Sequence, residues 1–286
     1  MIKETEISIR SANKEDRAQL AHIIHFESYV HRHLDWRPPL DWIGHTPYII
    51  AEKNKRVIGA LACPPDPLEI SWIRVFAATS KLGGKKAWNL LWPKTQEILT
   101  KMGTESVVAI PLQDWFKDIL IQNNFEHVHN VVILVWESEN LENPVSNGDF
   151  SIRPMKPNDL EVVQEIDEAA FGPIWRNSED TLKLAYTQAL AASVAIDKDK
   201  KILGYQISTP SPFGAHLARL AVLPETQGQG IGFHLTRQVQ SMFKDRLSTR
   251  VSVNTQDNNF ASLGLYKKAG FELTGEIYPV FQYKLK

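Results

Sequence analysis

Short apolar runs and helical periodicities alternate along this chain, and the same order occurs twice. In the first half, strand patterns at residues 48–52, 56–62 and 69–77 precede a helical pattern from about Lys85 to Lys101. The strand SVVAI, a shorter helix around Trp115–Gln122 and the strands FEHV and NVVILVW follow. This alternation predicts an α/β domain on a mixed sheet with flanking helices.

The second half repeats this order. SVAID, ILGYQIS and AHLARLAVL predict strands, a helix is expected from Gly230 to about Leu247, and RVSVN predicts the next strand. A helix around Phe260–Ala269 then precedes the strand patterns FELTGE and PVFQYKL. The two halves also begin with similar sequences: ISIRSANKEDRAQL at Ile7–Leu20 resembles FSIRPMKPNDLEVV at Phe150–Val163.

A duplication divides the chain into two domains. We predict them at residues 1–137 and 150–286. Between them, residues 138–149 (SENLENPVSNGD) are rich in Asn, Ser, Pro and Gly and lack helical periodicity, so they predict a linker.

Composition narrows the class of protein. Of the 286 residues, 43% are hydrophobic and 23% are charged, which is typical of globular proteins and excludes a disordered or fibrous chain. The 32 basic and 33 acidic residues give a net charge of −1. Because no basic stripe is visible, we expect no nucleic-acid partner.

Cysteine usage and hydropathy indicate the compartment. The single cysteine, Cys63, excludes an intramolecular disulfide and fits a reducing compartment. The N-terminal residues are charged where a secretory signal would have an apolar core. No stretch approaches the ~20 apolar residues of a membrane helix. We therefore expect a cytoplasmic protein without a membrane partner.

The most informative segment, LARLAVLPETQGQGIGFHLTRQVQ, runs from Leu217 to Gln240. A predicted strand ends at Leu223, Pro224 stops it, and glycines recur at positions 228, 230 and 232 before an amphipathic helix. Glycine allows a sharp turn and a close approach of a ligand to the backbone. The unpaired N–H groups and the dipole at a helix start favour a phosphate or pyrophosphate.

Two familiar nucleotide loops do not match this segment. A Rossmann fingerprint needs its third glycine where this sequence has Phe233, and a Walker loop needs a Gly-Lys-Ser/Thr ending. The other interpretation is a structural turn whose glycines adopt special backbone angles. Spacing alone does not choose between a phosphate loop and a structural turn.

With this loop the chain resembles a known family. Strand–Pro–x–x–Gln–Gly–x–Gly–Ile–Gly–helix is similar to the acyl-CoA-binding motif of the GNAT acetyltransferase superfamily. A second family motif follows as NTQDNNFASLGLYKKAGFEL, from Asn254 to Leu273. The resemblance covers residues 150–286 and, more weakly, the first half. It implies an α/β (α+β) fold of two tandem GNAT-like domains, each with a mixed, mostly antiparallel sheet flanked by helices.

The resemblance implies an acyl-CoA co-substrate, expected to be acetyl-CoA, and no metal. Its pantetheine arm would pair with the fourth strand of the second half at Leu220, Ala221 and Val222. Gln227 stands where the family has Arg or Gln, and Asn259 matches the residue that contacts the cofactor arm. The amides that would hold the pyrophosphate are those of Gly228, Gln229, Gly230, Ile231, Gly232 and Phe233.

Tyr266 matches the family tyrosine that serves the CoA sulfur. Acyl transfer from a thioester to an amine develops negative charge on the carbonyl oxygen and then on the leaving sulfur. A backbone N–H near the end of the fourth strand can stabilise the oxyanion. A phenol with a pKa of about 10 can protonate an alkyl thiolate. The alternative for Tyr266 is an ordinary half-buried aromatic residue.

The attacking amine must lose a proton, so a general base is expected. The family uses no fixed residue for this step. His216 on the fourth strand is our catalytic candidate, because an imidazole titrates near neutrality. Asp167, Glu168 and Asp257 are other candidates, and a structural or exposed histidine is the alternative for His216.

The acceptor side is expected along residues 165–180, between the first two helices of the resembled fold. Phe171, Trp175 and Arg176 are predicted to form an apolar wall with a cationic edge, with core packing and surface exposure as their alternatives. Asp167 and Glu168 would suit a cationic amine, and a solvated helix face explains them equally well.

The first half departs from both motifs. WIRVFAATSKLGGKKAWNLL lacks the proline and the Gln/Arg–Gly step, and keeps only the glycines of the segment Gly83–Lys86. Leu120 stands at the tyrosine position, and a leucine cannot protonate a thiolate. We predict a degenerate copy that supports, shapes or regulates the second domain, with CoA or another anion on Gly83–Lys86 as the alternative.

The histidines at 22, 25, 31 and 33 have no accompanying acid or cysteine cluster, so no metal site is expected.

The sequence therefore predicts an acyl-CoA-dependent N-acyltransferase in which an amine attacks directly in a ternary complex. Cys63 has no motif around it, so no acyl-enzyme is expected. The acceptor would be a small-molecule amine or a peptide N-terminus, and the protein a monomer or homodimer. The alternative is a non-catalytic acyl-CoA-binding sensor or interaction module.

Overall fold

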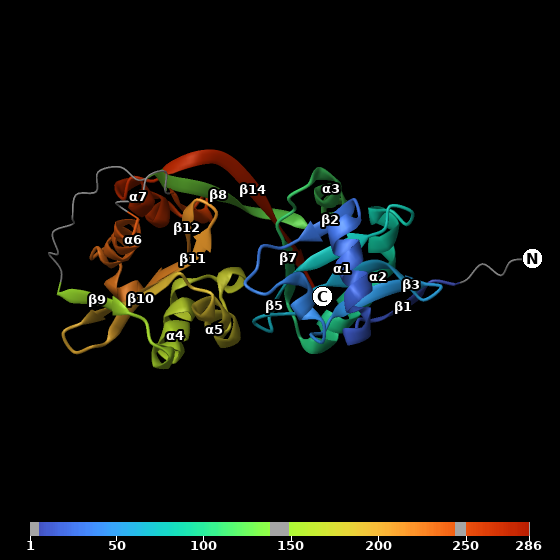
Figure 1. The fold of residues 1–286 in the computed structure, drawn as a ribbon, viewed down its shortest axis with the longest axis horizontal. Helices are drawn as coiled ribbons and strands as arrows, with labels where there is room; N and C mark the ends of the chain where they lie inside the picture. The colour runs from blue at the N-terminus through green and yellow to red at the C-terminus, as the bar shows by residue number, and fades with distance from the viewer. Residues whose placement is uncertain (1–5, 138–148, 244–249, 286) are drawn as a thin grey trace, which may run out of the picture. The chain divides into compact units, whose positions relative to one another are not determined.

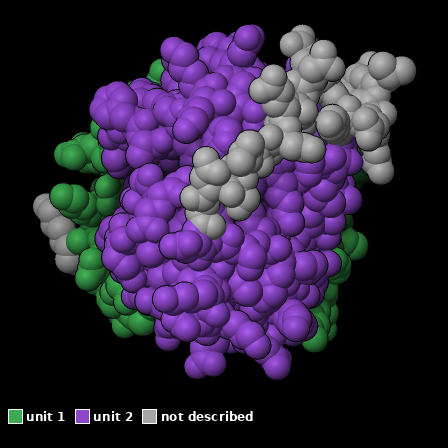
Figure 2. Space-filling view, turned by 90° about the vertical axis from the view of Figure 1, so that its left-hand side faces the viewer, with its two compact units in different colours: residues 1–128, 278–286 green, residues 129–277 purple. Residues whose placement is uncertain are grey.

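The structure is a computed structural model that describes residues 6–137, 149–243 and 250–285. Its contacts divide the chain into two compact units: unit 1 contains residues 1–128 and 278–286, and unit 2 contains residues 129–277. Figure 1 labels their elements and Figure 2 colours the two units. All but Asp149 of the predicted linker lies outside the described residues.

Unit 1 is built on a five-stranded antiparallel sheet in the order β1-β3-β4-β6-β2. Alternation along β3 directs Ile49 toward α2 and Ile50 toward α1, so the two helices cover opposite faces. A smaller ladder pairs β5 in parallel with β7, and β7 with the C-terminal part of β14. The elements are β1 (Ser8–Ser11), α1 (Arg17–Phe26), β2 (Tyr29–Arg32), β3 (Tyr48–Lys53), β4 (Arg56–Ala62), β5 (Ile70–Trp72), β6 (Val75–Ala78), α2 (Gly84–Met102), β7 (Ser106–Ala109) and α3 (Asp114–Gln122), with 3-10 turns η1 (Lys14–Asp16) and η2 (Pro39–Trp42).

Unit 2 repeats this plan. Strands β9 to β12 are antiparallel neighbours, β12 runs parallel to β13, and β13 pairs with β8. Helices α6 and α7 lie on one face of this sheet and α4 and α5 on the other (Figure 1). The elements are β9 (Phe150–Pro154), α4 (Leu160–Ala170), α5 (Glu179–Thr187), β10 (Ala191–Asp197), β11 (Ile202–Ser211), β12 (Gly214–Val222), α6 (Ile231–Ser241), β13 (Arg250–Gln256) and α7 (Phe260–Lys268), with 3-10 turns η3 (Pro157–Asp159), η4 (Pro173–Trp175) and η5 (Pro224–Thr226).

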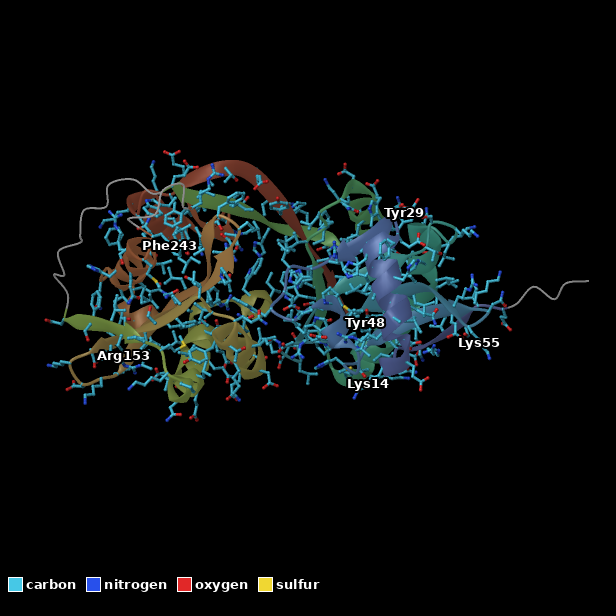
Figure 3. All side chains as sticks on the ribbon, viewed as in Figure 1. Lys14, Tyr29, Tyr48, Lys55, Arg153 and Phe243 are labelled. Carbon is cyan, nitrogen blue, oxygen red and sulfur yellow. The ribbon has the colours of Figure 1, made fainter. Side chains whose placement is uncertain are left out.

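The sequence echo at the start of each half is a structural repeat. Arg10 donates from both terminal nitrogens to Asp16 at 2.7 Å, and Arg153 binds Asp159 in the same two-pronged way at 2.7 and 2.9 Å. Each aspartate also accepts a backbone N–H from the residue three positions before it. The Ile-Arg signature therefore anchors the first strand to the first helix in both units, and Figure 3 labels Arg153.

Two predicted pairs of strands are single long strands. FEHV and NVVILVW form β8 (Glu126–Glu137), and the last two strand patterns form β14 (Glu272–Lys284). Each strand contributes to both units, because unit 1 ends at Val128 and resumes at Tyr278. In unit 2, residues 131–137 of β8 pair with β13, whereas in unit 1, residues 281–284 of β14 pair with β7.

The two domains predicted from the sequence therefore do not coincide with the two compact units. The predicted ranges 1–137 and 150–286 assign β8 and β14 whole to one half each, whereas the contacts divide both strands. A strand pattern carries no information about which half supplies its hydrogen-bonding partner, so the exchange is invisible in the sequence. The predicted helix from Gly230 is α6, which ends at Ser241, and residues 244–249 lie outside the described part.

Candidate active site

The central strand of unit 2 separates from one neighbour halfway along its length. β12 pairs with β11 from Gly214 to Val222, but β13 pairs only with Gly214–Leu217. The last parallel pair is Leu217 with Val253. Beyond this pair the two parallel strands form a fork, which leaves one edge of β12 without a strand partner among the described elements.

A β-bulge lies at this fork. Ile207 of β11 is opposite Arg219 and Ser208 is opposite Leu217, so Ala218 has no partner in the ladder. The extra residue reverses the alternation of side chains. Leu217 and Leu220 both pack in the core beneath α6 and α7, while Arg219 reaches α4 on the other face. Ala218 thus lies at the bulge without an opposite residue on β11, beside the point where the strands diverge.

Backbone groups of Leu220 and Val222 face the open edge. In an antiparallel ladder, successive residues direct their N–H and C=O groups to opposite sides. Leu223 donates its N–H to Leu203 of β11, so Leu220 and Val222 point away from β11. Of the three positions predicted to pair with a cofactor arm, these two have outward backbone groups, and Ala221 bonds toward β11 instead.

The turn between β12 and α6 contains two glycines in the left-handed region. Gly228 has φ 78° and Gly230, the N-cap of α6, has φ 85°. A Cβ on Gly228 would meet no heavy atom within 4 Å, so its backbone faces open space. The first turn of α6 offers the N–H groups of Ile231, Gly232 and Phe233, which helical bonds do not use. This geometry suits a phosphate.

The other loop residues have distinct roles. A Cβ on Gly232 would lie 2.7 Å from Leu265 Cδ1, so this glycine lets α6 and α7 approach each other. Gln227 donates from Nε2 to the carbonyl of Val222 at 3.1 Å and braces the loop against its own strand. Gln229 is exposed, and the Phe233 ring lies about 5 Å from two cations, those of Arg237 and Lys268.

Helix α7 brings Tyr266 beneath the fork. Tyr266 is 5% exposed and packs in one cluster with Leu217 and Val253, the last parallel pair. Burial raises the pKa of its phenol above the ordinary value, so the hydroxyl stays protonated at neutral pH. Asn259 caps α7, accepting from the Ser262 N–H at 3.1 Å, and its predicted contact with a cofactor stays a prediction.

His216 lies on the face of β12 that is opposite α6. Its Nδ1 is 2.9 Å from Ser252 Oγ, and Asn254 of β13 also hydrogen-bonds the ring. Burial lowers the pKa of His216 despite these partners, so the imidazole is neutral at pH 7 and able to accept a proton. Its role as a base stays a prediction.

A buried ion pair, Asp167 with Arg219, organises the predicted acceptor side. Asp167 is fully buried, so it is neither an exposed base nor part of a solvated helix face. Arg219 donates to both of its carboxylate oxygens, at 2.6 and 2.8 Å, and to the carbonyl of Trp175 at 2.6 Å. Tyr205 donates its hydroxyl to Asp167, and burial holds the pKa of that phenol well above the ordinary value.

The three predicted wall residues surround this pair. The Phe171 ring lies 3.5 Å from the Arg219 guanidinium, and the Trp175 carbonyl accepts from the same group. Arg176 donates from Nε to the Phe171 carbonyl at 3.1 Å and lies 3.7 Å from Glu168. All three are half-buried. Sequence reasoning missed Arg219, and its only signal was a charged residue within a mostly apolar central strand.

Within residues 6–137, 149–243 and 250–285, no group of three or more His, Cys, Asp and Glu side chains is placed to hold a metal ion. Across the described helices, none is long and apolar enough to cross a membrane.

The sequence of this chain is similar to those of known acetyltransferases. The model of the acetyltransferase (GNAT) family matches residues 160–271. A peptidyl-lysine N-acetyltransferase of Salmonella typhimurium is 30% identical over 118 residues, which are 36% of this chain and 74% of the relative. A putative ribosomal protein bS18 alanine N-acetyltransferase of Bacillus subtilis is 28% identical over 128 residues, 44% of this chain and 82% of the relative.

Solved structures share the fold of the whole chain. A tandem GNAT protein from the clavulanic acid biosynthesis pathway has a TM-score of 0.67 at 13% identity, with 99% of each chain covered. A GCN5-related N-acetyltransferase from Sphaerobacter thermophilus has a TM-score of 0.64 at 14% identity, covering 98% of this chain and 96% of that one. The chain therefore belongs to the GNAT acetyltransferase family and is an N-acetyltransferase of the tandem arrangement.

Proposed function

We propose that unit 2 transfers an acetyl group from acetyl-CoA to a primary amine by direct attack in a ternary complex. The observation that carries this proposal is the fork in unit 2. An open strand edge, a glycine loop at a helix start and a buried tyrosine meet where β12 and β13 diverge.

The residues present fit acetyl-CoA. The outward N–H groups of Leu220 and Val222 and the Leu220 carbonyl would pair with the amides of the pantetheine arm, because that arm, like a peptide, carries alternating donors and acceptors. The Val222 carbonyl is already bonded to Gln227. The amides from Gly228 to Phe233 would hold the pyrophosphate, where the left-handed glycines leave the backbone open. Neutralising the diphosphate needs only this local site, consistent with a net charge of −1.

Three groups would perform the chemistry. The N–H of Ala218, at the bulge, would stabilise the oxyanion that forms on the thioester carbonyl. His216, neutral at pH 7, would accept a proton from the amine, directly or through water. Tyr266, held protonated by burial, would donate its proton to the departing thiolate.

The acceptor is proposed to be a peptide amine. The two curated relatives carry names that specify a ribosomal protein alanine and a peptidyl lysine as acceptors. Phe171, Trp175 and Arg176 would form the wall against which such an acceptor lies. A small-molecule amine is the second class to test.

The test is thiol release from acetyl-CoA with a panel of acceptors. The panel contains an alanine-terminal peptide, a lysine peptide with a blocked N-terminus, and small amines. We expect turnover with at least one peptide, and a drop in kcat of about 10²-fold for Tyr266→Phe. Tyr283→Phe, in unit 1, is the matched control and should keep full activity. CoA binding without thiol release on any acceptor would contradict the proposal and favour a sensor.

A further inference from the structure

We propose that strand β2 occupies in unit 1 the place that the pantetheine arm takes in unit 2, so that the chain binds one acyl-CoA. This inference rests on the function proposed for unit 2. It follows from a comparison of the edge of the central strand in the two units: β2 pairs with this edge in unit 1, whereas no described strand pairs with it in unit 2.

The central strand of unit 1 is divided like that of unit 2. Its first part, β5, pairs in parallel with β7, and its second part, β6, pairs with β4. Ile73 donates its N–H to Val108 of β7, whereas Arg74 donates to Ala62 of β4, both at 2.9 Å. The partner thus changes between two consecutive residues, and a fork follows a short parallel stretch, as it does in β12.

In unit 1 the edge at the fork is covered. Thr79 donates its N–H to Ile58 of β4, so by alternation Phe76 and Ala78 direct their backbone groups away from β4. These two residues stand opposite His31 and Tyr29 of β2. In unit 2 the equivalent outward groups, on Leu220 and Val222, have no such strand among the described elements.

Strand β2, which covers this edge, stands at the position in the repeat where unit 2 has its proposed acceptor-binding segment. β2 follows α1, where unit 2 has the segment Phe171–Arg176 and then α5 after α4. The segment after the first helix is therefore a strand in unit 1, whereas in unit 2 it forms the proposed wall of the acceptor site.

Side chains of β2 fill the space around the edge. The Tyr29 ring, labelled in Figure 3, packs edge-on against Trp115 at 5.4 Å. A Cβ on Gly84, the first residue of α2, would lie 3.1 Å from that ring. His31 is 4% exposed, stacks on Phe116 at 4.3 Å and bonds the carbonyl of Ile73 at 3.2 Å. Tyr29 thus covers the helix start, and His31 anchors the strand.

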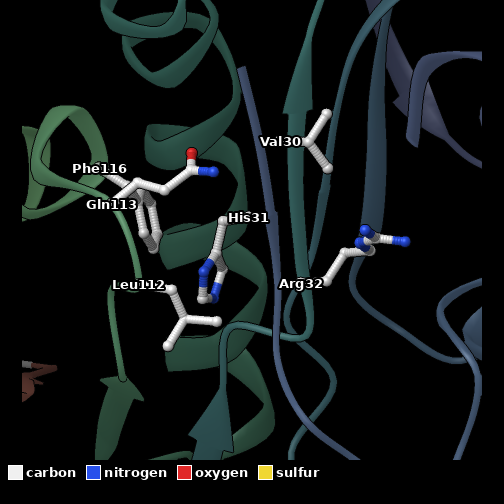
Figure 4. Close-up of a pocket in the computed structure, with 6 residues that line it drawn as sticks. All are labelled: Val30, His31, Arg32, Leu112, Gln113 and Phe116. Carbon is white, nitrogen blue, oxygen red and sulfur yellow. The ribbon is translucent and has the colours of Figure 1, made fainter. Parts of the chain in front are cut away.

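The cavity beside β2 is too small for a cofactor arm. A cavity of about 110 Å³ lies beside β2, and Figure 4 shows its lining. It has room for a few water molecules, whereas ligand pockets usually measure ≈ 300–1,000 Å³. The residues that line it are Val30, His31, Arg32, Leu112, Gln113 and Phe116.

Calorimetric titration of the full chain with CoA tests the inference. We expect one site per chain. Gly228→Val should weaken binding at least tenfold, because the new side chain would fill the open space before the phosphate loop. Gly83→Val is the matched control: Gly83 has the same φ of 78° and the same open surroundings, but it lies in unit 1. It should leave both affinity and stoichiometry unchanged.

Each outcome decides a different point. Two sites per chain would overturn the inference, although acyl-CoA binding would stand. The same holds for a single site that survives Gly228→Val and is lost in Gly83→Val. No binding at all would overturn the proposed function and the inference with it. Hydrogen exchange adds a readout independent of the variants: amides at residues 76 and 78 should be protected without CoA, and those at 220 and 222 only with it. Protection at 76 and 78 that appears only with CoA would also overturn the inference.

Discussion

At the scale of single residues, Arg219 connects the central strand to the segment that is predicted to bind the acceptor. Its guanidinium satisfies both oxygens of a fully buried carboxylate and one loop carbonyl. Lysine keeps the charge but lacks the planar fork that reaches three acceptors. We expect Arg219→Lys to raise the KM for the acceptor about tenfold while the Kd for CoA is unchanged, because the proposed cofactor contacts are on the open edge of β12 and on the loop before α6. Steady-state kinetics and calorimetry measure these two constants.

A second arginine in the same unit gives the control. Arg153 forms a two-pronged bond to Asp159 at the start of unit 2, outside the candidate site. Arg153→Lys should lower stability to a similar extent without changing the acceptor KM. If both variants raise the KM equally, the effect of Arg219 is general destabilisation and the positioning role is wrong.

His31 makes the stability of unit 1 sensitive to acid. Burial lowers its pKa to about 4 from an ordinary value of 6.5, and the pKa of the nearby His33 is lowered by burial and by Arg74. Between pH 4 and pH 6.5, the unfolded chain binds more protons at His31 than the folded chain does. The free energy of unfolding therefore has its full value above pH 6.5 and decreases as the pH falls toward 4. The loss assigned to His31 is about 3 kcal/mol at most.

Urea denaturation at pH 7 and pH 4.5 measures this dependence. His31→Phe keeps a ring on Phe116 but removes the proton site. It should therefore lower stability at pH 7 by about 1 kcal/mol, from the lost hydrogen bond, and show a smaller acid loss than the wild type. An unchanged acid loss in this variant would assign the effect to other groups.

At the scale of elements, the contact between α6 and α7 depends on one glycine. A methyl group on Gly232 would lie 2.7 Å from Leu265 Cδ1, so the Leu265 side chain would have to turn away from α6. We expect Gly232→Ala to cost about 1–3 kcal/mol, as overpacked sites do. Gly264→Ala, four residues into α7 with nothing within 4 Å, should instead stabilise the helix by about 0.5–1 kcal/mol. Thermal melts of both variants test this difference, and equal signs would contradict it.

Elements were predictable where their pattern is local. The helices α2, α3 and α7 begin and end within a residue or two of the predicted positions, because local signals define them. Gly83 and Gly103 flank α2, α3 has an amphipathic period, and Asn259 and Gly270 flank α7. β2 was not predicted, since Tyr29–Arg32 is extended only because β6 pairs with it. In the candidate site, the glycine loop was visible in the sequence. The pair of Asp167 with Arg219 was not, because it joins residues 52 positions apart.

At the scale of the whole molecule, the exchanged strands make each unit depend on both halves of the chain. Residues 131–137 of β8 complete the unit 2 ladder beside β13, and Val132, Leu134 and Trp136 are buried in its core. Three buried apolar side chains contribute about 6 kcal/mol, which is comparable to the net stability of a whole domain.

This dependence predicts how fragments of the chain behave. A fragment of residues 150–286 has lost the strand that completes its core, so we expect it to aggregate or remain unfolded, whereas a fragment of residues 129–277 retains that strand and should bind CoA. Circular dichroism and calorimetry compare the two. In a second experiment, residues 1–137 and 150–286 are produced together as two separate chains. The pieces should co-elute in gel filtration and separate only in denaturant, because each contains a strand of the other's unit. Separation under native conditions, or a 150–286 fragment that binds CoA like the full chain, would show that the halves fold independently.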